Sequence, residues 1–266
     1  MAEPRALILA GYGINCDKET KFAFERAGAR AELVHINDLI DGHRRLEDYQ
    51  ILAFPGGFSY GDDTGAGNAL ASRIRNHLWD DVRKFVERDH LAIGICNGFQ
   101  VMANLGLLPA LDGNYGNREV ALVHNDNARY TDRWVDLRFE GNSVWANGLK
   151  FMSLPIAHGE GKFYASEKML KRISGAEQVA ARYDYDYVCM HGELEANPNG
   201  SLEDIAAISD ESGRLIGMMP HPERAIDFTQ LPYWTLKKER LLREGREVPD
   251  EAPGIHIFKN GVEYFK

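Results

Sequence analysis

The chain has 266 residues, 44% of them hydrophobic and 10% aromatic, which is enough to bury one large core and excludes a disordered or fibrous chain. Its 31 basic and 40 acidic side chains leave a net charge of -9, which argues against a general nucleic-acid binder and against an anionic membrane surface as partner. Cys16, Cys96 and Cys189 have no paired spacing, so we expect neither a disulfide framework nor a zinc site, and a cytoplasmic location fits. No stretch approaches the length of a transmembrane helix.

The beginning of the chain predicts a β-α-β unit. Residues 5–10 form a buried strand, Asp17 is expected to cap a helix that Gly28 closes, and residues 31–36 form the next strand. Because the connections are short, we expect the two strands to pair in parallel through a right-handed crossover. A dinucleotide fingerprint would need a third glycine where Cys16 stands, so a Rossmann cofactor site is excluded.

A Gly-Gly loop follows the next buried strand, which covers residues 49–54. Ligands of open α/β sheets bind at the carboxyl ends of strands, where residues 55–63 lie. Gly56 and Gly57 can turn a backbone N–H toward a reacting carbonyl and so form part of an oxyanion hole. An isolated Gly-Gly is more often a plain turn, and this alternative stays open here. Residues 70–86 then form one long helix whose apolar stripe belongs to the core.

The next junction between a strand and a helix carries a cysteine. Residues 91–95 read as a buried strand and residues 97–105 as a helix, so Cys96 lies at the turn between them. Gly94 and Gly98 allow neighbouring backbone to approach, while the helix directs its positive end at the sulfur and favours the thiolate. The alternative is that Cys96 is a small buried hydrophobe, as most free cysteines are.

A segment far downstream supplies the partners that a thiolate nucleophile needs. An imidazole must take and return the proton, and a carboxylate must orient the imidazole. His221 and Glu223 are two residues apart, so an extended backbone would direct both side chains to one side, with Pro220 and Pro222 stiffening it. Alone, His221 would be a surface-loop histidine; together with Cys96, the pattern predicts a Cys-His-Glu site.

In the middle of the chain, the alternation of strands and helices gives way to short strands and polar loops. Residues 120–123 and 134–139 read as short strands that continue the sheet in antiparallel fashion. Residues 151–164 form a strand that runs into a glycine-hinged polar loop with His158 and Glu160. These two side chains could be a second acid/base pair, a metal-ligand pair or substrate-positioning residues; we favour positioning, because no third metal ligand has a suitable spacing.

The following elements lead to His221. We expect a short helix over residues 166–173, two strand pieces within 178–190 and a turn at 197–201. Residues 205–209 and 215–219 form a hairpin that ends next to His221. Beyond Ala225 we expect a charged, solvated helix over 236–247 and a final strand over 255–265, the alternative being a docking element for a partner. Together, these elements predict an α/β fold. Its open, mostly parallel sheet is flanked by helices and extended by antiparallel strands.

Three motifs in this order resemble those of the class I glutamine amidotransferases, which have a flavodoxin-like α/β fold. They are Gly56-Gly57, residues 94–100 and residues 220–223. Finer motifs are similar to the glutaminase subunits of phosphoribosylformylglycinamidine synthase, an enzyme of purine biosynthesis; they lie at residues 54–62, 155–161, 197–201 and 217–224. The likeness spans residues 7–224. Residues 63–65 and 125–131 fit this pattern less well, which leaves the glutamine pocket and the ammonia exit open.

The resemblance implies roles for individual residues. Cys96, His221 and Glu223 carry over as the catalytic triad, and Gly57 and Asn97 as oxyanion donors. Glutamine would be hydrolysed to glutamate and ammonia through a γ-glutamyl thioester. Substrate-binding residues are expected to be Gly56, Phe58, Gln100, His158 and Glu160.

The resemblance also implies partners. Ammonia would pass to a large ATP-dependent synthetase subunit that converts formylglycinamide ribonucleotide to formylglycinamidine ribonucleotide, with a small accessory subunit in the same complex. We expect no cofactor or metal on this chain, which has no phosphate-binding Gly-x-x-x-x-Gly-Lys-Ser/Thr motif; ATP and Mg belong to the partner. The amidotransferase domain is expected over residues 1–227, with an extension over 228–266 packed on that domain or on a partner.

Two other classes of protein share parts of this pattern. A DJ-1-like protein or a cysteine peptidase would have the cysteine at the turn, but the late Pro220-His221-Pro222-Glu223 segment argues against both. A non-catalytic scaffold descended from an amidotransferase would lack one member of the triad, and all three are present. Neither class should bind glutamine, so protection of Cys96 from alkylation by glutamine separates them from a glutaminase.

Overall fold

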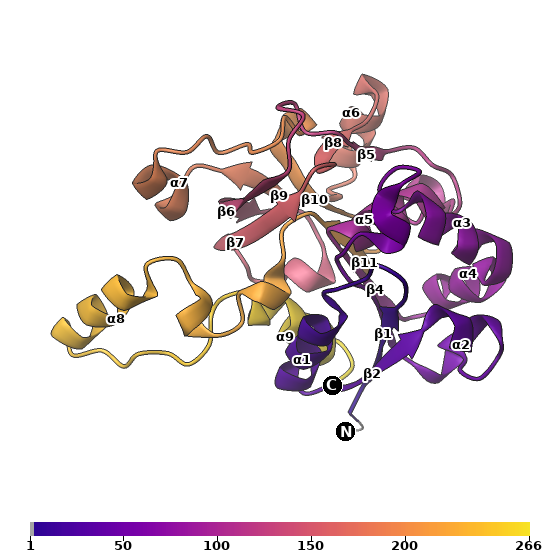
Figure 1. Ribbon diagram of the computed structural model, residues 1–266, viewed down its shortest axis with the longest axis horizontal. Coiled ribbons are helices and arrows are strands. Elements are labelled where there is room, and N and C mark those ends of the chain that lie inside the picture. Colours follow the sequence, from indigo (N-terminus) through magenta and orange to yellow (C-terminus); the bar gives the residue numbers. More distant parts are fainter. Residues whose placement is uncertain (1–2) are drawn as a thin grey trace.

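The computed structural model describes residues 3–266, which fold around one mixed sheet of nine strands (Figure 1). Its strands are β1 (Arg5–Ala10), β2 (Arg30–His35), β3 (Ile51–Phe54), β4 (Leu91–Ile95), β6 (Thr131–Phe139), β7 (Phe151–His158), β9 (Val179–Asp184), β10 (Ile205–Ser209) and β11 (Leu215–Met218). Across the sheet their order is β2-β1-β3-β4-β11-β10-β9-β6-β7. The strands from β2 to β11 are parallel, and those from β10 to β7 continue the sheet in antiparallel pairs. The predicted α/β fold with antiparallel additions is confirmed.

Helices cover both faces of the parallel half. The helices of the described residues are α1 (Asp17–Ala27), α2 (Ile36–Ile40), α3 (Asn68–His77), α4 (Trp79–Glu87), α5 (Asn97–Leu105), α6 (Glu167–Gly175), α7 (Tyr187–Gly192), α8 (Trp234–Arg243) and α9 (Ile255–Glu263), of which α6, α7 and α8 lie away from the parallel strands (Figure 1). Figure 1 shows α1 and α9 side by side on one side of the parallel strands, and α3, α4 and α5 on the other. Two short strands, β5 (Ala121–Val123) and β8 (Lys162–Tyr164), form a separate antiparallel pair, so the expectation that residues 120–123 continue the main sheet was wrong.

The core follows from this layering. Every residue of β3, β4, β10 and β11 is buried, as expected for strands covered on both faces. Within residues 3–266, no helix combines the length and apolar character needed to cross a membrane.

The prediction of a final strand over residues 255–265 was wrong, because this segment forms α9. Ile255 and Ile257 alternate as in a strand, but Ile255, Phe258 and Val262 recur at helical spacing and are buried. The ring of Phe258 meets that of Phe24 on α1, with centroids 5.0 Å apart. The end of the chain therefore packs in the main core.

The prediction of a second strand within residues 178–190 was also wrong, because the end of this segment forms α7. The buried carboxylate of Asp136 on β6 accepts the N–H groups of Asp186 (3.2 Å) and Cys189 (2.8 Å) at the start of this helix. The group that holds the start of α7 thus lies 50 residues upstream of Asp186 in the sequence, beyond the reach of local patterns.

Two smaller predictions about helices need correction. The expected single helix over residues 70–86 is two helices, because Leu78 has φ -131° and ψ 4° and separates α3 from α4. Asp17 is the first residue of α1 and accepts the N–H of Lys18, so the cap position belongs to Cys16.

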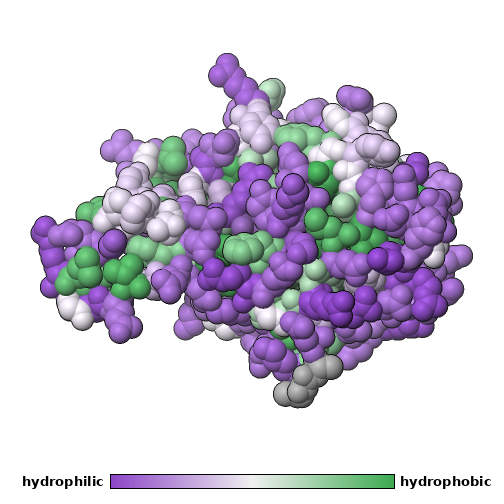
Figure 2. Space-filling model, turned by 60° about the horizontal axis from the view of Figure 1, so that its bottom comes forward, coloured by the Kyte–Doolittle hydropathy of each residue, from purple (hydrophilic) through white to green (hydrophobic). Residues whose placement is uncertain are grey.

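The charged helix predicted over residues 236–247 is α8, which covers a shorter range and projects from the body of the protein (Figure 1). Every residue of α8 is at least partly exposed. Leu236 and Leu242 are 42% and 54% exposed, and Figure 2 shows green side chains at the left end of the molecule among purple ones. A small apolar cluster of Phe228, Leu231 and Ala252 packs with Trp234 at the base of this projection.

Candidate active site

The turn between β4 and α5 holds Cys96 in a strained conformation. Its φ is 52° and its ψ is -107°, a combination that costs about 1–3 kcal/mol for a residue with a side chain. Gly98 permits this turn, because a Cβ there would lie 1.8 Å from the carbonyl oxygen of Phe54. A Cβ at Gly94 would lie 2.7 Å from the carbonyl oxygen of Gly98. Gly94 and Gly98 therefore allow the backbone at residues 54, 94 and 98 to pack closely around the turn that carries Cys96.

His221 reaches the same place from β11. This strand pairs in parallel with β4, with Met218 opposite Ile95, and the N–H of Cys96 donates to the carbonyl of Met218 at 2.7 Å. The chain beyond β11 therefore leaves the sheet next to Cys96. His221 and Glu223 are each 1% exposed.

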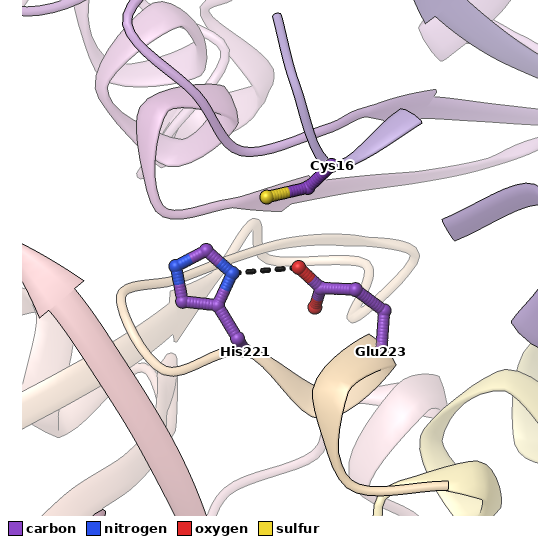
Figure 3. Close-up of side chains that lie close together, drawn as sticks. All are labelled: Cys16, His221 and Glu223. Atoms are coloured by element: carbon purple, nitrogen blue, oxygen red, sulfur yellow. Dashed lines mark hydrogen bonds and ion pairs between the residues drawn. The ribbon is translucent and has the colours of Figure 1, made fainter. Parts of the chain in front are cut away.

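His221 and Glu223 are in contact, but not through an extended backbone. Residues Pro222–Arg224 form a 3-10 turn, and this turn brings the carboxylate back onto the ring. The distance from His221 Nδ1 to Glu223 Oε1 is 2.6 Å (Figure 3). The expectation of two side chains on one side of a strand was wrong in its geometry, although the pair itself forms.

The charges around His221 favour its protonated form. Burial by itself would lower the pKa of His221, but the Glu223 carboxylate and the Cys96 sulfur outweigh it and hold this pKa well above its usual value. The other ring nitrogen of His221, Nε2, is buried and makes no hydrogen bond within residues 3–266. A buried imidazolium held by a carboxylate is the partner that a thiolate requires.

Cys16 is a second sulfur at this site, and sequence reasoning missed it. Figure 3 shows its side chain directed toward His221 and Glu223, and ligand atoms of these three residues all lie within 4.8 Å of one another. Arg224 donates to Cys16 Sγ at 2.9 Å, and this cation opposes the binding of a metal ion there. The signal available in the sequence was the position of Cys16 just after a parallel strand, at the carboxyl edge of the sheet.

The segment that contains Cys16 also fixes the Gly-Gly turn. The N–H groups of Asn15 and Cys16 donate to the carbonyl of Gly56 at 3.2 and 3.1 Å. Gly57 has φ 149°, and a Cβ there would lie 2.5 Å from the carbonyl oxygen of Gly13. Only glycine therefore allows this close approach. Asn97 is in the first turn of α5, where backbone N–H groups lack acceptors within the helix.

A cavity of about 160 Å³ lies in front of Cys96. It is lined by Gly57, Phe58, Asp62, Ala66, Cys96, Gln100, Tyr130, Ala157, His158, Gly159 and Glu160. Four of the five predicted substrate-binding residues are among them. The fifth, Gly56, does not line the cavity; its carbonyl accepts the N–H groups of residues 15 and 16.

The amide of Gln100 is used within the protein. Its Nε2 donates to the carbonyl of Glu160 at 2.6 Å, and its Oε1 accepts from the side chain of Asn97 at 2.9 Å. The Glu160 carboxylate accepts the N–H of Ala66 at 3.1 Å. Gln100 thus ties α5 to the loop after β7 and shapes the cavity.

Sequence reasoning did not single out Asp62 or Tyr130 as site residues. Burial, with the nearby Glu160 charge adding to it, raises the pKa of Asp62 above its usual value. Tyr130 is 53% exposed, and its ring lies 6.0 Å from that of Phe58, which is 42% exposed. These two aromatic rings form the outer wall of the cavity. Tyr130 falls in the segment that fits the family pattern less well, so motifs could not identify it.

Comparison with known proteins agrees with this architecture. Residues 3–265 match the family model of the CobB/CobQ-like glutamine amidotransferase domain. The chain therefore belongs to this glutamine amidotransferase family, as the resemblance in the sequence predicted.

Its relatives narrow the assignment. The phosphoribosylformylglycinamidine synthase subunit PurQ of Methanococcus maripaludis is 48% identical over 266 residues, covering 98% of this chain and 97% of that one. The PurQ subunit of Dehalococcoides mccartyi is 41% identical over 268 residues, with 99% and 98% covered. The solved structure of PurLQS from Thermotoga maritima contains a chain that is 29% identical and superimposes with a TM-score of 0.73, each chain being covered completely. Within the amidotransferase family, the chain belongs to the PurQ subunits of phosphoribosylformylglycinamidine synthase.

Proposed function

We propose that this chain hydrolyses L-glutamine with Cys96 as nucleophile, His221 as acid and base, and Glu223 as the group that orients the imidazole. The observation that carries the proposal is the convergence of three buried groups at neighbouring parallel strands. Cys96 follows β4, His221 follows β11, and Glu223 lies 2.6 Å from the ring. The glutamine amidotransferase family of this chain supports the same reaction.

The reaction follows from this geometry. The Cys96 thiolate attacks the side-chain amide carbon of glutamine, and the N–H groups of Gly57 and Asn97 stabilise the oxyanion. His221 donates its proton to the departing nitrogen, the C–N bond breaks, and ammonia leaves a γ-glutamyl thioester. Water then gives a proton to His221 and attacks the thioester, which releases glutamate and restores the thiolate.

The cavity suits an amino acid substrate. The carboxylates of Asp62 and Glu160 supply negative charge for the ammonium group of glutamine, and Phe58 covers the aliphatic part. Gln100 and His158 line the walls of the cavity, and the carbonyl of Gly56 holds the neighbouring turn in place. The strained Cys96 is at the base of this cavity.

The proposal extends to partners. The structural relative is titled as a complex, PurLQS, and we propose that a large and a small subunit likewise assemble with this chain. The large subunit would use ATP and Mg, receive the ammonia and convert formylglycinamide ribonucleotide to formylglycinamidine ribonucleotide. We propose a reducing cytoplasm as the location, which the free thiols of Cys16, Cys96 and Cys189 within residues 3–266 support.

The extension over residues 228–266 has two parts in this proposal. α9 belongs to the amidotransferase core, because its buried side chains lie against α1. The exposed α8 is the part available to a partner. Deleting the α8 projection alone, rather than everything after residue 227, therefore tests docking without removing core side chains.

The first experiment measures glutamate release from glutamine by the chain alone and with the synthetase subunit, ATP and formylglycinamide ribonucleotide. We expect release to rise with the partner and amidine product to accompany it. Cys96→Ala should abolish release, while the matched variant Cys189→Ala should retain it, because Cys189 lies in α7. Turnover by Cys96→Ala near that of the unmodified protein would overturn the triad.

A second measurement separates a glutaminase from other cysteine proteins. Glutamine should protect Cys96 from alkylation, and the reaction at Cys96 can be followed by peptide mass mapping. Unchanged alkylation at saturating glutamine would contradict the proposal and favour a site of another class.

A further inference from the structure

His158 is a buried histidine that the proposed triad does not use. It ends β7, is 2% exposed and lines the cavity in front of Cys96. The residue before it, Ala157, contacts the nucleophile through its carbonyl, 3.6 Å from Cys96 Sγ. His158 is therefore within the reaction chamber.

Hydrogen bonds from Asn125 define the tautomer of His158. Asn125 Nδ2 donates to two carbonyls, those of His158 and Arg129, each at 2.9 Å. Its Oδ1 consequently faces the N–H of Gly161 at 3.0 Å and His158 Nδ1 at 3.2 Å. Because an amide oxygen only accepts, Nδ1 of His158 must carry the hydrogen.

The other ring nitrogen is left as a bare acceptor. Burial, together with the charge of the nearby His221, lowers the pKa of His158 to about 4, so the ring is neutral near pH 7. Nε2 then has a lone pair and no proton. It is buried, and no group among residues 3–266 donates to it. A buried acceptor without a donor is costly and indicates a missing partner.

The ring cannot turn away to find another donor. Gly161 lies against it so closely that a Cβ there would come within 2.2 Å of the ring atoms Cε1 and Nδ1. Asn125, itself 2% exposed, holds the Nδ1 edge. The loop after β7 thus closes over the imidazole and fixes the direction of its free lone pair.

We propose that Nε2 of His158 accepts a hydrogen bond from the leaving nitrogen of the substrate, first as the glutamine amide and then as ammonia. This inference rests on the proposed glutaminase reaction. The balance of that reaction is unchanged: the S–C bond forms, the C–N bond breaks, and the proton on ammonia comes from His221. His158 takes no proton and holds the nitrogen by one of its N–H groups.

The same lone pair makes the site selective. Glutamate carries a carboxylate oxygen, and an ester carries an alkoxy oxygen, where glutamine carries NH2. Neither oxygen can donate to Nε2, and a carboxylate is repelled by it. His158 therefore distinguishes the amide substrate from its own hydrolysis product.

The test compares two substrates with the same acyl group, glutamine and glutamate γ-methyl ester. In His158→Phe, kcat/KM for glutamine should fall about 10- to 100-fold while that for the ester stays unchanged or rises. His191→Phe, at an exposed position of α7, should leave both values unchanged. Equal losses on both substrates, or no loss on glutamine, would overturn the inference. If the unmodified protein releases no glutamate at all, the proposed function fails instead.

A second measurement does not depend on the His158 variant folding. The ¹⁵N spectrum of the histidine rings should show His158 protonated on Nδ1, and glutamine added to Cys96→Ser should shift the Nε2 resonance while Nδ1 stays in place. A proton on Nε2, or an Nε2 chemical shift that does not change at saturating glutamine, would contradict the proposal.

Discussion

Replacing Glu223 by glutamine removes one charge from the site and little else. Glu223 Oε1 is 2.6 Å from His221 Nδ1, and Oε2 is buried with no hydrogen-bond partner among residues 3–266. The amide of the variant can therefore keep its oxygen on the ring and put its NH2 where Oε2 was. We expect the fold to persist and the orientation of the imidazole to be largely kept.

The magnitude follows from burial. Both side chains are nearly inaccessible, at 1% exposure each, and a buried charge that loses its partner is destabilised by about 3–5 kcal/mol. The proposed reaction needs the imidazolium form of His221, so the same cost is expected in the barrier of that reaction. Since each 1.36 kcal/mol of barrier is a factor of ten, kcat/KM for glutamine should fall about 10²- to 10⁴-fold in Glu223→Gln. The pKa of His221 should fall too, because burial lowers it and the carboxylate would no longer oppose burial.

The assay is glutamate release as a function of pH, with thermal unfolding as the control for folding. The imidazolium form is lost at lower pH in the variant, so the alkaline limb of the kcat/KM profile should move toward acid. A folded Glu223→Gln protein with kcat/KM within about threefold of the unmodified chain would refute the assigned role of this pair.

Three further perturbations test other parts of the site. Gly57→Ala places a Cβ 2.5 Å from the carbonyl of Gly13 and displaces the proposed oxyanion donor, so steady-state kinetics should show kcat reduced about 10²- to 10³-fold with a smaller change in KM. Cys16→Ala removes a sulfur that raises the pKa of His221, so the alkaline limb of the rate profile should move to lower pH, whereas Cys189→Ala should leave it in place. The native pKa of His158, about 4, is below the unfolded value of about 6.5, so the unfolded chain binds the extra proton and stability falls as pH drops through this window. Urea unfolding should show a loss of about 2 kcal/mol from this residue between pH 7.5 and pH 5, and His158→Phe should lack that part of the loss.

Local patterns predicted the elements that carry Cys96 and His221. The apolar runs at β4 and β11, the glycines around Cys96 and the hairpin before His221 all encode their structure within a few residues. Those predictions are confirmed at the level of the elements. The family could be predicted for the same reason, because its motifs lie at these turns.

Contacts between distant segments could not be predicted. The start of α7 is held by Asp136 on another strand, and α9 is a helix because its apolar face packs on α1. At the site, the positions of Cys16 and Asn125 depend on loops that meet only when the sheet forms. Glu223 was identified correctly as the neighbour of His221, but a 3-10 turn rather than an extended backbone joins them.

The position of β11 has a consequence for synthesis of the chain. It is the last strand to leave the ribosome, yet it lies between β4 and β10 in the middle of the sheet. Until it inserts, two interior strands expose unpaired edges, and such edges bind other chains. A product that terminates before residue 215 would carry Cys96 with no base beside it. The topology thus delays ammonia release until translation is nearly complete. Insertion of β11 is also the folding step at which binding of a chaperone would do most to prevent aggregation.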